Sequence, residues 1–203
     1  MSAVTSVLLA GVGGQGVLLA SEVLAEVASL AGHDVKKSEV HGMAQRGGSV
    51  VSHLRFGAQV FSPLIPRGAA DYLVSFERLE TLRYLDSLHA GSLVLVNNQR
   101  ILPLPVSVGK AAYPDDVEGR LQAAGARALF VDGQALAAAA GNAKAVNAVI
   151  LGALAALMDF APGLWEEALR HQVPARLLEV NLRAFALGRE SHGKPGSASP
   201  GSR

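Results

Sequence analysis

Residues 11–16 read Gly-Val-Gly-Gly-Gln-Gly and place glycines at the Gly-x-Gly-x-x-Gly spacing of a phosphate-binding turn. Four apolar residues, 7–10, precede this segment, and a helical apolar pattern follows it over residues 17–30. A buried strand is therefore expected to enter the turn and a helix to leave it. Glycines permit a sharp turn and a close approach of backbone to ligand, and the N–H groups of the first helical turn favour an anion.

The pattern predicts contacts to a phosphate-bearing ligand from Gly11, Gly13, Gly14, Gln15 and Gly16. A second hypothesis assigns the glycines only to the reversal of the chain over the sheet, because such turns also occur where nothing binds. The spacing alone does not separate these two hypotheses.

A second glycine-rich segment, residues 39–48, carries side chains suited to acting on a ligand. His41 is able to shuttle a proton near neutral pH, and Arg46 is able to clamp a carboxylate or phosphate through two hydrogen bonds. We take these two as candidate catalytic residues. The alternative is an ordinary connection with solvated charges and a histidine that caps a turn. The predicted active-site loop comprises Glu39, His41, Gln45, Arg46, Gly47 and Gly48.

Strands alternate with helices along most of the chain, which predicts an α/β fold. The strand over 34–38 would run parallel to the first strand, and those over 49–56 and 59–62 would form an antiparallel pair. A proline-containing crossing follows residue 97 and leads to Asp116, the expected cap of a helix that ends near 124. Further strands are expected over 70–76, 93–96 and 128–131, and further helices over 77–88, 135–140, 144–158, 164–171 and 174–187.

These elements together predict a three-layer domain with a mostly parallel mixed sheet, a Rossmann-like start and a C-terminal helical cluster. Both glycine-rich segments follow strands of the same direction, so both are expected at the carboxyl edge of the sheet, where open α/β sheets bind ligands.

The composition excludes several classes of protein. Half of the 203 residues are hydrophobic and 17% are charged, which favours one domain with a large core. The formal net charge of +1 gives no electrostatic case for nucleic acid, and the absence of cysteine excludes disulfides and thiolate-held iron–sulfur clusters. The apolar run 145–158 is too short to cross a bilayer and predicts a buried helix, with a subunit interface as the alternative. Without a signal-like start, the protein is expected to be cytoplasmic.

Three segments together resemble the γ-type domain of the 2-oxoacid:ferredoxin oxidoreductases, most of all the small subunits that serve aryl pyruvates such as indolepyruvate. They are the glycine turn at 11–16, the segment Ser-Glu-Val-His-Gly-Met-Ala-Gln-Arg-Gly-Gly-Ser-Val-Val-Ser-His over 38–53, and Asn-Leu-Arg-Ala-Phe-Ala-Leu-Gly over 181–188. The resemblance extends over almost the whole chain, and the middle segment is the most distinctive.

The resemblance implies a complex in which a large α subunit carries thiamine diphosphate, magnesium and [4Fe-4S] clusters. This complex decarboxylates the 2-oxoacid, transfers the acyl group to coenzyme A and passes electrons to ferredoxin. The small chain would hold no cofactor alone and no metal, and its two glycine-rich loops would face the chamber near coenzyme A or the substrate. The length of the chain predicts a single domain, over residues 1–188. Residues 189–203 are mostly Gly, Pro, Ser and charged residues, which predicts a disordered tail. A homodimer of the isolated chain is left open.

Three other classes of protein fit the same sequence patterns. A free-standing NAD(P)- or flavin-dependent enzyme would use the glycine turn, with Glu39 as the ribose-binding acid, although Glu39 lies farther from Gly11 than the usual interval of about 20 residues. An adenylating enzyme also begins with such a turn. A non-catalytic assembly subunit would use the loops only to fit a partner. The histidines lack metal-site spacing, there is no Gly-x-Ser-x-Gly elbow, and the near thiamine motif Val131-Asp132-Gly133 lacks its first glycine.

Overall fold

The computed structural model describes residues 4–41 and 48–191, which form a six-stranded sheet between two layers of helices. The strand order is β2-β3-β1-β4-β5-β6. The strands are β1 (Thr5–Val12), β2 (Asp34–His41), β3 (Ser49–Gly57), β4 (Ala70–Ser75), β5 (Leu88–Asn97) and β6 (Arg127–Val131). Strands β1, β4, β5 and β6 pair in parallel, whereas β3 is antiparallel to both β1 and β2. The predicted mostly parallel mixed sheet is confirmed.

The partner predicted for β3 is wrong. Residues 59–62 form no strand, and β3 lies between β1 and β2, in register with the full length of each. A four-residue strand that ends at Pro63 would supply few ladder bonds, whereas this position buries Leu54 and Phe56 in the core. Strand β2 runs in the direction of β1, as expected, but is not its neighbour.

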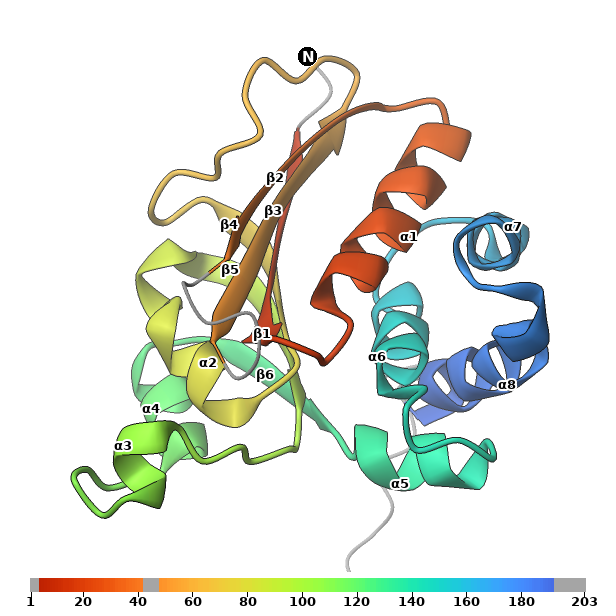
Figure 1. Cartoon of the computed structure of the whole chain (residues 1–203). Coiled ribbons are helices and arrows are strands. Elements are labelled where there is room, and N and C mark those ends of the chain that lie inside the picture. Colours follow the sequence, from red (N-terminus) through yellow and green to blue (C-terminus); the bar gives the residue numbers. More distant parts are fainter. Residues whose placement is uncertain (1–3, 42–47, 192–203) are drawn as a thin grey trace, which may run out of the picture.

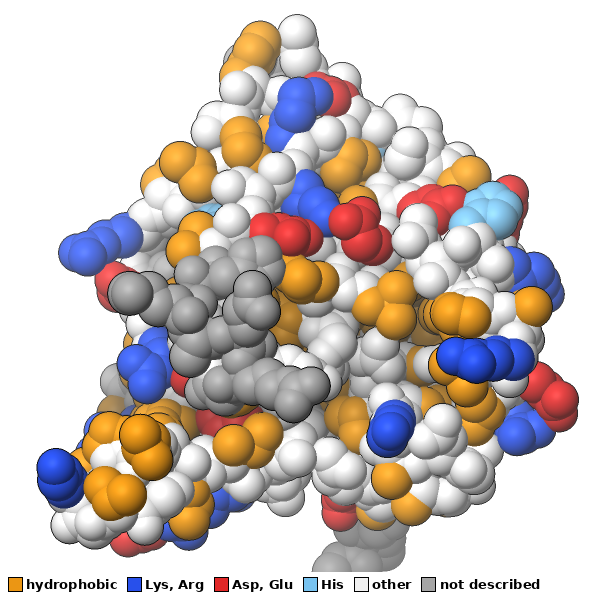
Figure 2. Space-filling view, in the orientation of Figure 1, with side chains coloured by type: hydrophobic (Ala, Val, Ile, Leu, Met, Phe, Trp, Pro, Cys, Tyr) orange, Lys and Arg blue, Asp and Glu red, His pale blue; other side chains and the backbone are white. Residues whose placement is uncertain are grey.

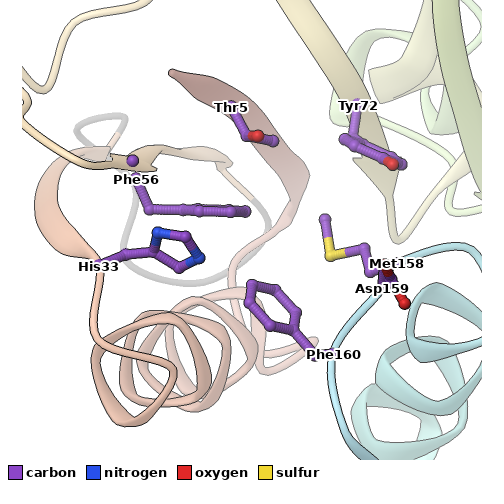
Figure 3. A pocket seen from close by; sticks show the side chains of 8 residues that line it. Thr5, His33, Phe56, Tyr72, Met158, Asp159 and Phe160 are labelled. Atoms are coloured by element: carbon purple, nitrogen blue, oxygen red, sulfur yellow. The ribbon is translucent and has the colours of Figure 1, made fainter. Parts of the chain in front are cut away.

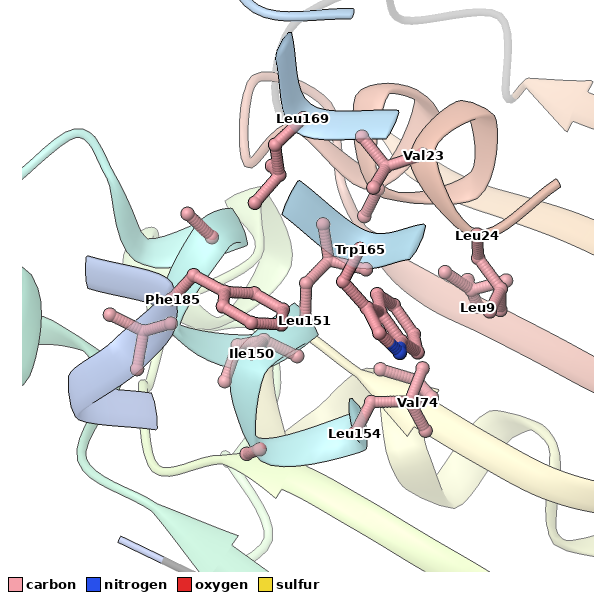
Figure 4. Close-up of a cluster of buried hydrophobic side chains, with 14 of the residues drawn as sticks. Leu9, Val23, Leu24, Val74, Ile150, Leu151, Leu154, Trp165, Leu169 and Phe185 are labelled. Carbon is pink, nitrogen blue, oxygen red and sulfur yellow. The ribbon is translucent and has the colours of Figure 1, made fainter. Parts of the chain in front are cut away.

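Each face of the sheet is covered by its own helices, which gives the three predicted layers (Figure 1). One face packs against the predicted C-terminal cluster and the first helix: α1 (Val17–Leu30), α5 (Gly133–Ala139), α6 (Val146–Ala155), α7 (Pro162–Gln172) and α8 (Ala175–Ser191). The other face packs against α2 (Arg78–Arg83), the short 3₁₀ helix η1 (Leu85–Ser87) and α4 (Val117–Ala123). Trp165 of α7 lies among side chains from the sheet and from α6, as Figure 4 shows.

The helix predicted over 77–88 is shorter than expected. It ends at Arg83, and β5 begins at Leu88, so Gly91 lies inside a strand and does not stop a helix. Hydrogen bonds to the preceding strand hold the segment in the sheet, with Ser92 Oγ donating to the Ala70 carbonyl oxygen at 2.6 Å. Asp116 caps α4 as predicted, by accepting from Gly119 N at 2.7 Å. The proline-containing crossing includes a short helix, α3 (Leu104–Ser107), that sequence patterns did not indicate.

Helix α6 is buried in the core of this chain, as predicted, and crosses α8 at very close range. A Cβ atom on Gly152 would lie 1.9 Å from the carbonyl oxygen of Phe185, and one on Gly188 would lie 2.0 Å from that of Val149. The two glycines therefore let the helix backbones touch, each facing the other helix. Helix α8 continues past Gly188 to Ser191, so the predicted domain boundary falls within a helix. Across the described residues, no helix has the length and apolar character needed to cross a bilayer.

This crossing gives a first prediction. Gly188→Ala should lower the free energy of unfolding by about 3 kcal/mol, because the new methyl group has no room and the helices must separate. Urea denaturation of the purified chain measures the change. The control is Gly163→Ala in the first turn of α7, where no atom lies within 4 Å of the added Cβ. It should leave stability unchanged or raise it by up to about 1 kcal/mol, and equal effects at both positions would contradict the account of the crossing.

Candidate functional site

The carboxyl ends of β1, β4, β5 and β6 lie at one edge of the sheet, called here the carboxyl edge. The glycine loop of residues 13–16 leaves β1 there, and the turn at Phe76 and Glu77 leaves β4. Strand β5 ends at Asn97 and is followed by Asn98 and Gln99, and Asp132 follows β6. Strand β2 ends at His41 and β3 begins at Ser49, both at the same edge.

The two glycine-rich loops meet through a backbone hydrogen bond, in which Gly13 N donates to the carbonyl oxygen of Gly48 at 2.8 Å. This contact agrees with the expectation that both loops lie together. Gln45, Arg46 and Gly47 fall outside the described residues, and so does the side chain of His41, whose backbone is the last residue of β2. Their predicted roles stay predictions.

The glycine loop requires its glycines for conformational reasons. Gly14 and Gly16 have φ angles of 102° and 79°, in the region that side chains rarely adopt. A Cβ on Gly11 would lie 2.7 Å from Val17 Cγ2, so this glycine lets α1 pack closely on β1. Gly16 caps α1 without a side-chain hydrogen bond. The first turn of this 14-residue helix thus has no side-chain cap, which leaves its N–H groups available to an anion.

Gln15 has a structural role that the sequence did not indicate. Its Oε1 accepts from Val12 N at 2.7 Å, and its Nε2 donates to the carbonyl oxygen of Phe76 at 2.7 Å and to Gln99 Oε1 at 2.9 Å. The amide therefore fastens the glycine loop to the ends of β4 and β5. We expect the loop backbone, not this side chain, to be the part of the segment available to a ligand.

Asn97 continues this connection towards β6. Its side chain is fully buried, its Nδ2 donates to the Phe76 carbonyl oxygen at 3.0 Å, and its Oδ1 accepts from Gly133 N at 3.1 Å. The sequence pattern places Asn97 only in a turn that leaves the strand 93–96 and indicates no role for Gln99. The available signal was a polar residue at the end of a buried strand, since a buried amide must find partners.

A cavity of about 420 Å³ lies between the glycine loop and the start of α6. Gly14, Gln15, Gln99, Gln134 and Lys144 contribute to its lining. The Lys144 ammonium and the side-chain amides favour an anionic or strongly polar guest. Lys144 was missed in the sequence because its signal is weak: a lone basic residue just before a helix, at some 130 residues from the glycine loop in the chain.

Two buried carboxylates support the same edge. Glu77 is 1% exposed, and its Oε1 accepts from Tyr113 OH at 2.6 Å and from Ile101 N at 3.0 Å, while its Oε2 accepts from Glu80 N at 3.0 Å. Burial, and the hydrogen bond to Glu77, raise the pKa of Tyr113. Glu80 accepts from Ser49 Oγ at 2.5 Å and from Arg83 Nε at 2.9 Å. Glu80 therefore holds the start of β3, where the second glycine-rich segment ends.

Glu39 does not occupy a loop. It lies within β2, where its carboxylate pairs with Lys37 Nζ at 2.8 Å and accepts from Ser21 Oγ of α1 at 3.4 Å. Strand β3 separates β2 from β1, so Glu39 is two strands away from the strand that enters the glycine loop. In a dinucleotide-binding fold the ribose-binding acid follows the strand next to the first. The structure therefore does not support Glu39 as a ribose ligand.

A second cavity, of about 320 Å³, lies at the opposite edge of the sheet, where β1 begins. Figure 3 shows the rings of His33, Phe56 and Phe160 gathered on one side of it and Tyr72 on the other. The centroids of the Phe56 and Phe160 rings are 5.5 Å apart. The length of β1 separates this cavity from the glycine loops, so it does not extend the site at the carboxyl edge.

Comparison with known proteins agrees with this arrangement. The model of the pyruvate ferredoxin/flavodoxin oxidoreductase family matches residues 6–191. The chain belongs to this family, which confirms the resemblance found in the sequence.

The relatives are subunits of oxidoreductases. The chain is 40% identical over 188 residues to the indolepyruvate oxidoreductase subunit IorB of Thermococcus kodakarensis, covering 90% of this chain and 93% of that protein. Its fold is similar to the keto/oxoacid ferredoxin oxidoreductase gamma subunit of Geobacter sulfurreducens, with a TM-score of 0.69, 24% identity, and coverage of 93% and 98% of the two chains. It is also similar to 31% of a 2-oxoglutarate:ferredoxin oxidoreductase chain from Magnetococcus marinus, with a TM-score of 0.72, 20% identity and coverage of 93% of this chain.

The sequence has no cysteine, and the described residues contain no group of three or more His, Cys, Asp or Glu side chains suited to a metal ion. The groups at the carboxyl edge that are suited to binding a ligand are backbone N–H groups, side-chain amides and the Lys144 side chain.

The connection through Gln15 gives a second prediction. Gln15→Glu should lower the free energy of unfolding by about 2 kcal/mol or more, because a carboxylate cannot donate to Phe76 and Gln99. It also places a negative charge against both acceptor oxygens, which then keep only their hydrogen bonds from Asn97 Nδ2. Chemical denaturation at neutral pH measures this. The control Gln134→Glu adds the same charge to the same cavity from an exposed position and should change stability by less than about 0.5 kcal/mol. A Gln15→Glu chain as stable as the control would refute the structural role.

His53 gives a third prediction. It lies on β3 and its Nδ1 accepts from Ile65 N at 3.2 Å, while partial burial lowers the pKa of its imidazole. The unfolded chain, with a histidine pKa of about 6.5, then binds protons that the folded chain does not, so stability present above pH 6.5 is lost as the pH falls through this range. His53→Asn keeps an acceptor but cannot be protonated there. Unfolding measured between pH 7.5 and 5 should therefore show a smaller loss in the variant, and identical pH profiles would contradict this assignment.

Proposed function

We propose that this chain is the small subunit of an aryl-pyruvate:ferredoxin oxidoreductase, acting on indolepyruvate or a similar 2-oxoacid. The large subunit would carry thiamine diphosphate with magnesium and iron–sulfur clusters, and the complex would form an acyl-CoA and reduced ferredoxin. The observation that carries the proposal is 40% identity over 90% of the chain to the indolepyruvate oxidoreductase subunit IorB of Thermococcus kodakarensis.

In this proposal the carboxyl edge closes one wall of the reaction chamber. The backbone of the glycine loop, the start of α1 and Lys144 bind the phosphates of coenzyme A, since these groups supply N–H donors and a positive charge. The relative from Magnetococcus marinus, whose structure is described with coenzyme A bound, supports this choice of ligand. Thiamine diphosphate and the clusters would supply carbanion chemistry and one-electron transfer from the large subunit.

The second glycine-rich loop would complete the wall. Arg46 binds the carboxylate of the 2-oxoacid, and His41 moves a proton at the chamber. Contact between Gly13 and Gly48 supports a joint role for the two loops, because a ligand at one lies beside the other. A non-catalytic assembly subunit is the rival within the same complex, and it differs only in whether these side chains touch substrate.

The test uses the complex of this chain with its native large subunit, assayed by 2-oxoacid- and coenzyme-A-dependent reduction of a viologen dye. Lys144→Ala should raise the KM for coenzyme A about three- to tenfold, as expected for the loss of one partly exposed charge contact, with little change in the KM for the 2-oxoacid. Arg46→Ala and His41→Ala should lower kcat/KM at least about tenfold without preventing assembly. The control is Arg176→Ala, a cation exposed on α8.

Assembled Arg46→Ala and His41→Ala complexes with wild-type rates and apparent affinities would refute catalytic roles for those two side chains and favour the assembly subunit. A wild-type complex without 2-oxoacid-dependent activity would refute the proposed reaction. Titration of the isolated chain with NAD, monitored by fluorescence, tests the alternative that this chain is a free-standing dinucleotide-binding enzyme. We expect no saturable change, because Glu39 is engaged by Lys37 and lies two strands from β1.

A further inference from the structure

Residues 102–110, called here the arm, project from the body of the protein beside the carboxyl edge and contain α3 (Figure 1). Three aliphatic side chains of the arm are exposed: Leu102 at 48%, Leu104 at 75% and Val108 at 56%. Figure 2 shows hydrophobic side chains gathered on this projecting lobe. Apolar side chains exposed close together on a protruding element are typical of a protein–protein contact.

The arm is held in one conformation. Pro103 and Pro105 restrict the backbone on either side of Leu104, and Ser107 Oγ donates back to the carbonyl oxygen of Pro103 at 3.2 Å. Gly109, with a φ of 73°, turns the chain back, and Lys110 N donates to the Pro105 carbonyl oxygen at 2.8 Å. A surface ordered before binding loses less entropy when a partner covers it.

Buried Glu77 fixes both ends of the arm. Its Oε1 accepts from Ile101 N and from Tyr113 OH, so the residues just before and after the arm are tied to one carboxylate. The Arg100 guanidinium lies 4.1 Å from the ring centroid of Tyr113 and braces the same base. The exposed leucines are therefore carried on a rigid support and not on a loose loop.

The charged side chains in and beside the arm are all positive. Between Gln99 and Pro114 the chain has two cations, Arg100 and Lys110, and no aspartate or glutamate. A complementary surface would therefore be an apolar groove with an acidic rim.

The arm is continuous with the candidate site. A cavity of about 300 Å³ is lined by Leu102 and Leu104 from the arm and by Val12, Ser49 and Glu80 from the carboxyl edge. Val12 precedes the first glycine loop and Ser49 follows the second. A protein that covers the glycine loops would therefore also meet the arm.

The geometry points to the arm as the anchor by which this chain docks onto the large subunit, with Leu104 and Val108 entering an apolar groove whose acidic rim meets Lys110. This inference rests on the proposed function for the identity of the partner, and it adds the residues that hold the two subunits together. It places the large subunit over the carboxyl edge.

The test measures the Kd between the purified large subunit and variants of this chain. Leu104→Ser and Val108→Ser should each raise the Kd about tenfold or more, since each removes an aliphatic side chain buried on docking. Lys110→Glu should also weaken binding, and its effect should shrink at high salt because it is electrostatic. The matched control is Phe61→Ser: Phe61 is 87% exposed, but it follows β3 at the opposite edge of the sheet, so the Kd should stay within about twofold. Thermal unfolding of each isolated variant should match the wild type, because all four side chains are exposed.

Wild-type affinity in both arm serine variants, or an equal loss in Phe61→Ser, would overturn the inference while the activity of the complex still supports the proposed function. It would also be overturned if the isolated wild-type chain were a dimer that Leu104→Ser converts to a monomer, because the occupant would then be a second copy. Failure of the wild-type chain to bind the large subunit at all would overturn both proposals. If a serine variant melts early, the Lys110→Glu result at low and high salt decides between these outcomes.

Discussion

The side-chain amide of Gln15 is the interaction on which the arrangement of the carboxyl edge depends. One amide accepts from the end of β1 and donates to the residue after β4 and to Gln99 after β5. Asn97 extends the connection to Gly133 after β6. The Asn97 amide is fully buried and the Gln15 amide partly buried, and an amide removed from water is costly unless its donors and acceptor are paired. Here almost every partner lies at a strand end. The loops that follow four parallel strands are thereby held in one geometry, which a preformed binding surface requires.

Strand β3 determines which loops share that surface. By lying between β1 and β2 it moves β2 outward, and the end of β2 and the start of β3 both lie at the edge that carries the glycine loop. The bond between Gly13 and Gly48 then joins the two loops directly. The same insertion removes the acid of β2 from the position it would need in a dinucleotide enzyme. The position of β3 in the strand order therefore favours a binding surface formed by both glycine-rich segments over a dinucleotide-binding site.

Two buried carboxylates connect this wall to the proposed docking surface. Glu80 holds Ser49 at the start of β3, and Glu77 holds both ends of the arm through Ile101 and Tyr113. Both belong to the short segment after β4, so the start of β3 and the arm are positioned by neighbouring residues of one chain segment. A partner that docks on the arm would thus also meet the start of β3.

The sequence by itself determined the fold class, the helical C-terminal cluster, the buried helix α6, the cap at Asp116 and the family, because these follow from local patterns: apolar periodicity, glycine spacing and capping chemistry. It also predicted that the two glycine-rich loops would meet. The tertiary structure alone decided that β3 pairs with β1 and β2, that Gln15 turns inward, that Glu39 is engaged by Lys37, and that Lys144 faces the glycine loop. Most of these contacts join residues that are far apart in the chain. Such residues pair in the way that buries the most apolar surface while satisfying the buried hydrogen-bonding groups, and a local sequence pattern contains no information about that choice.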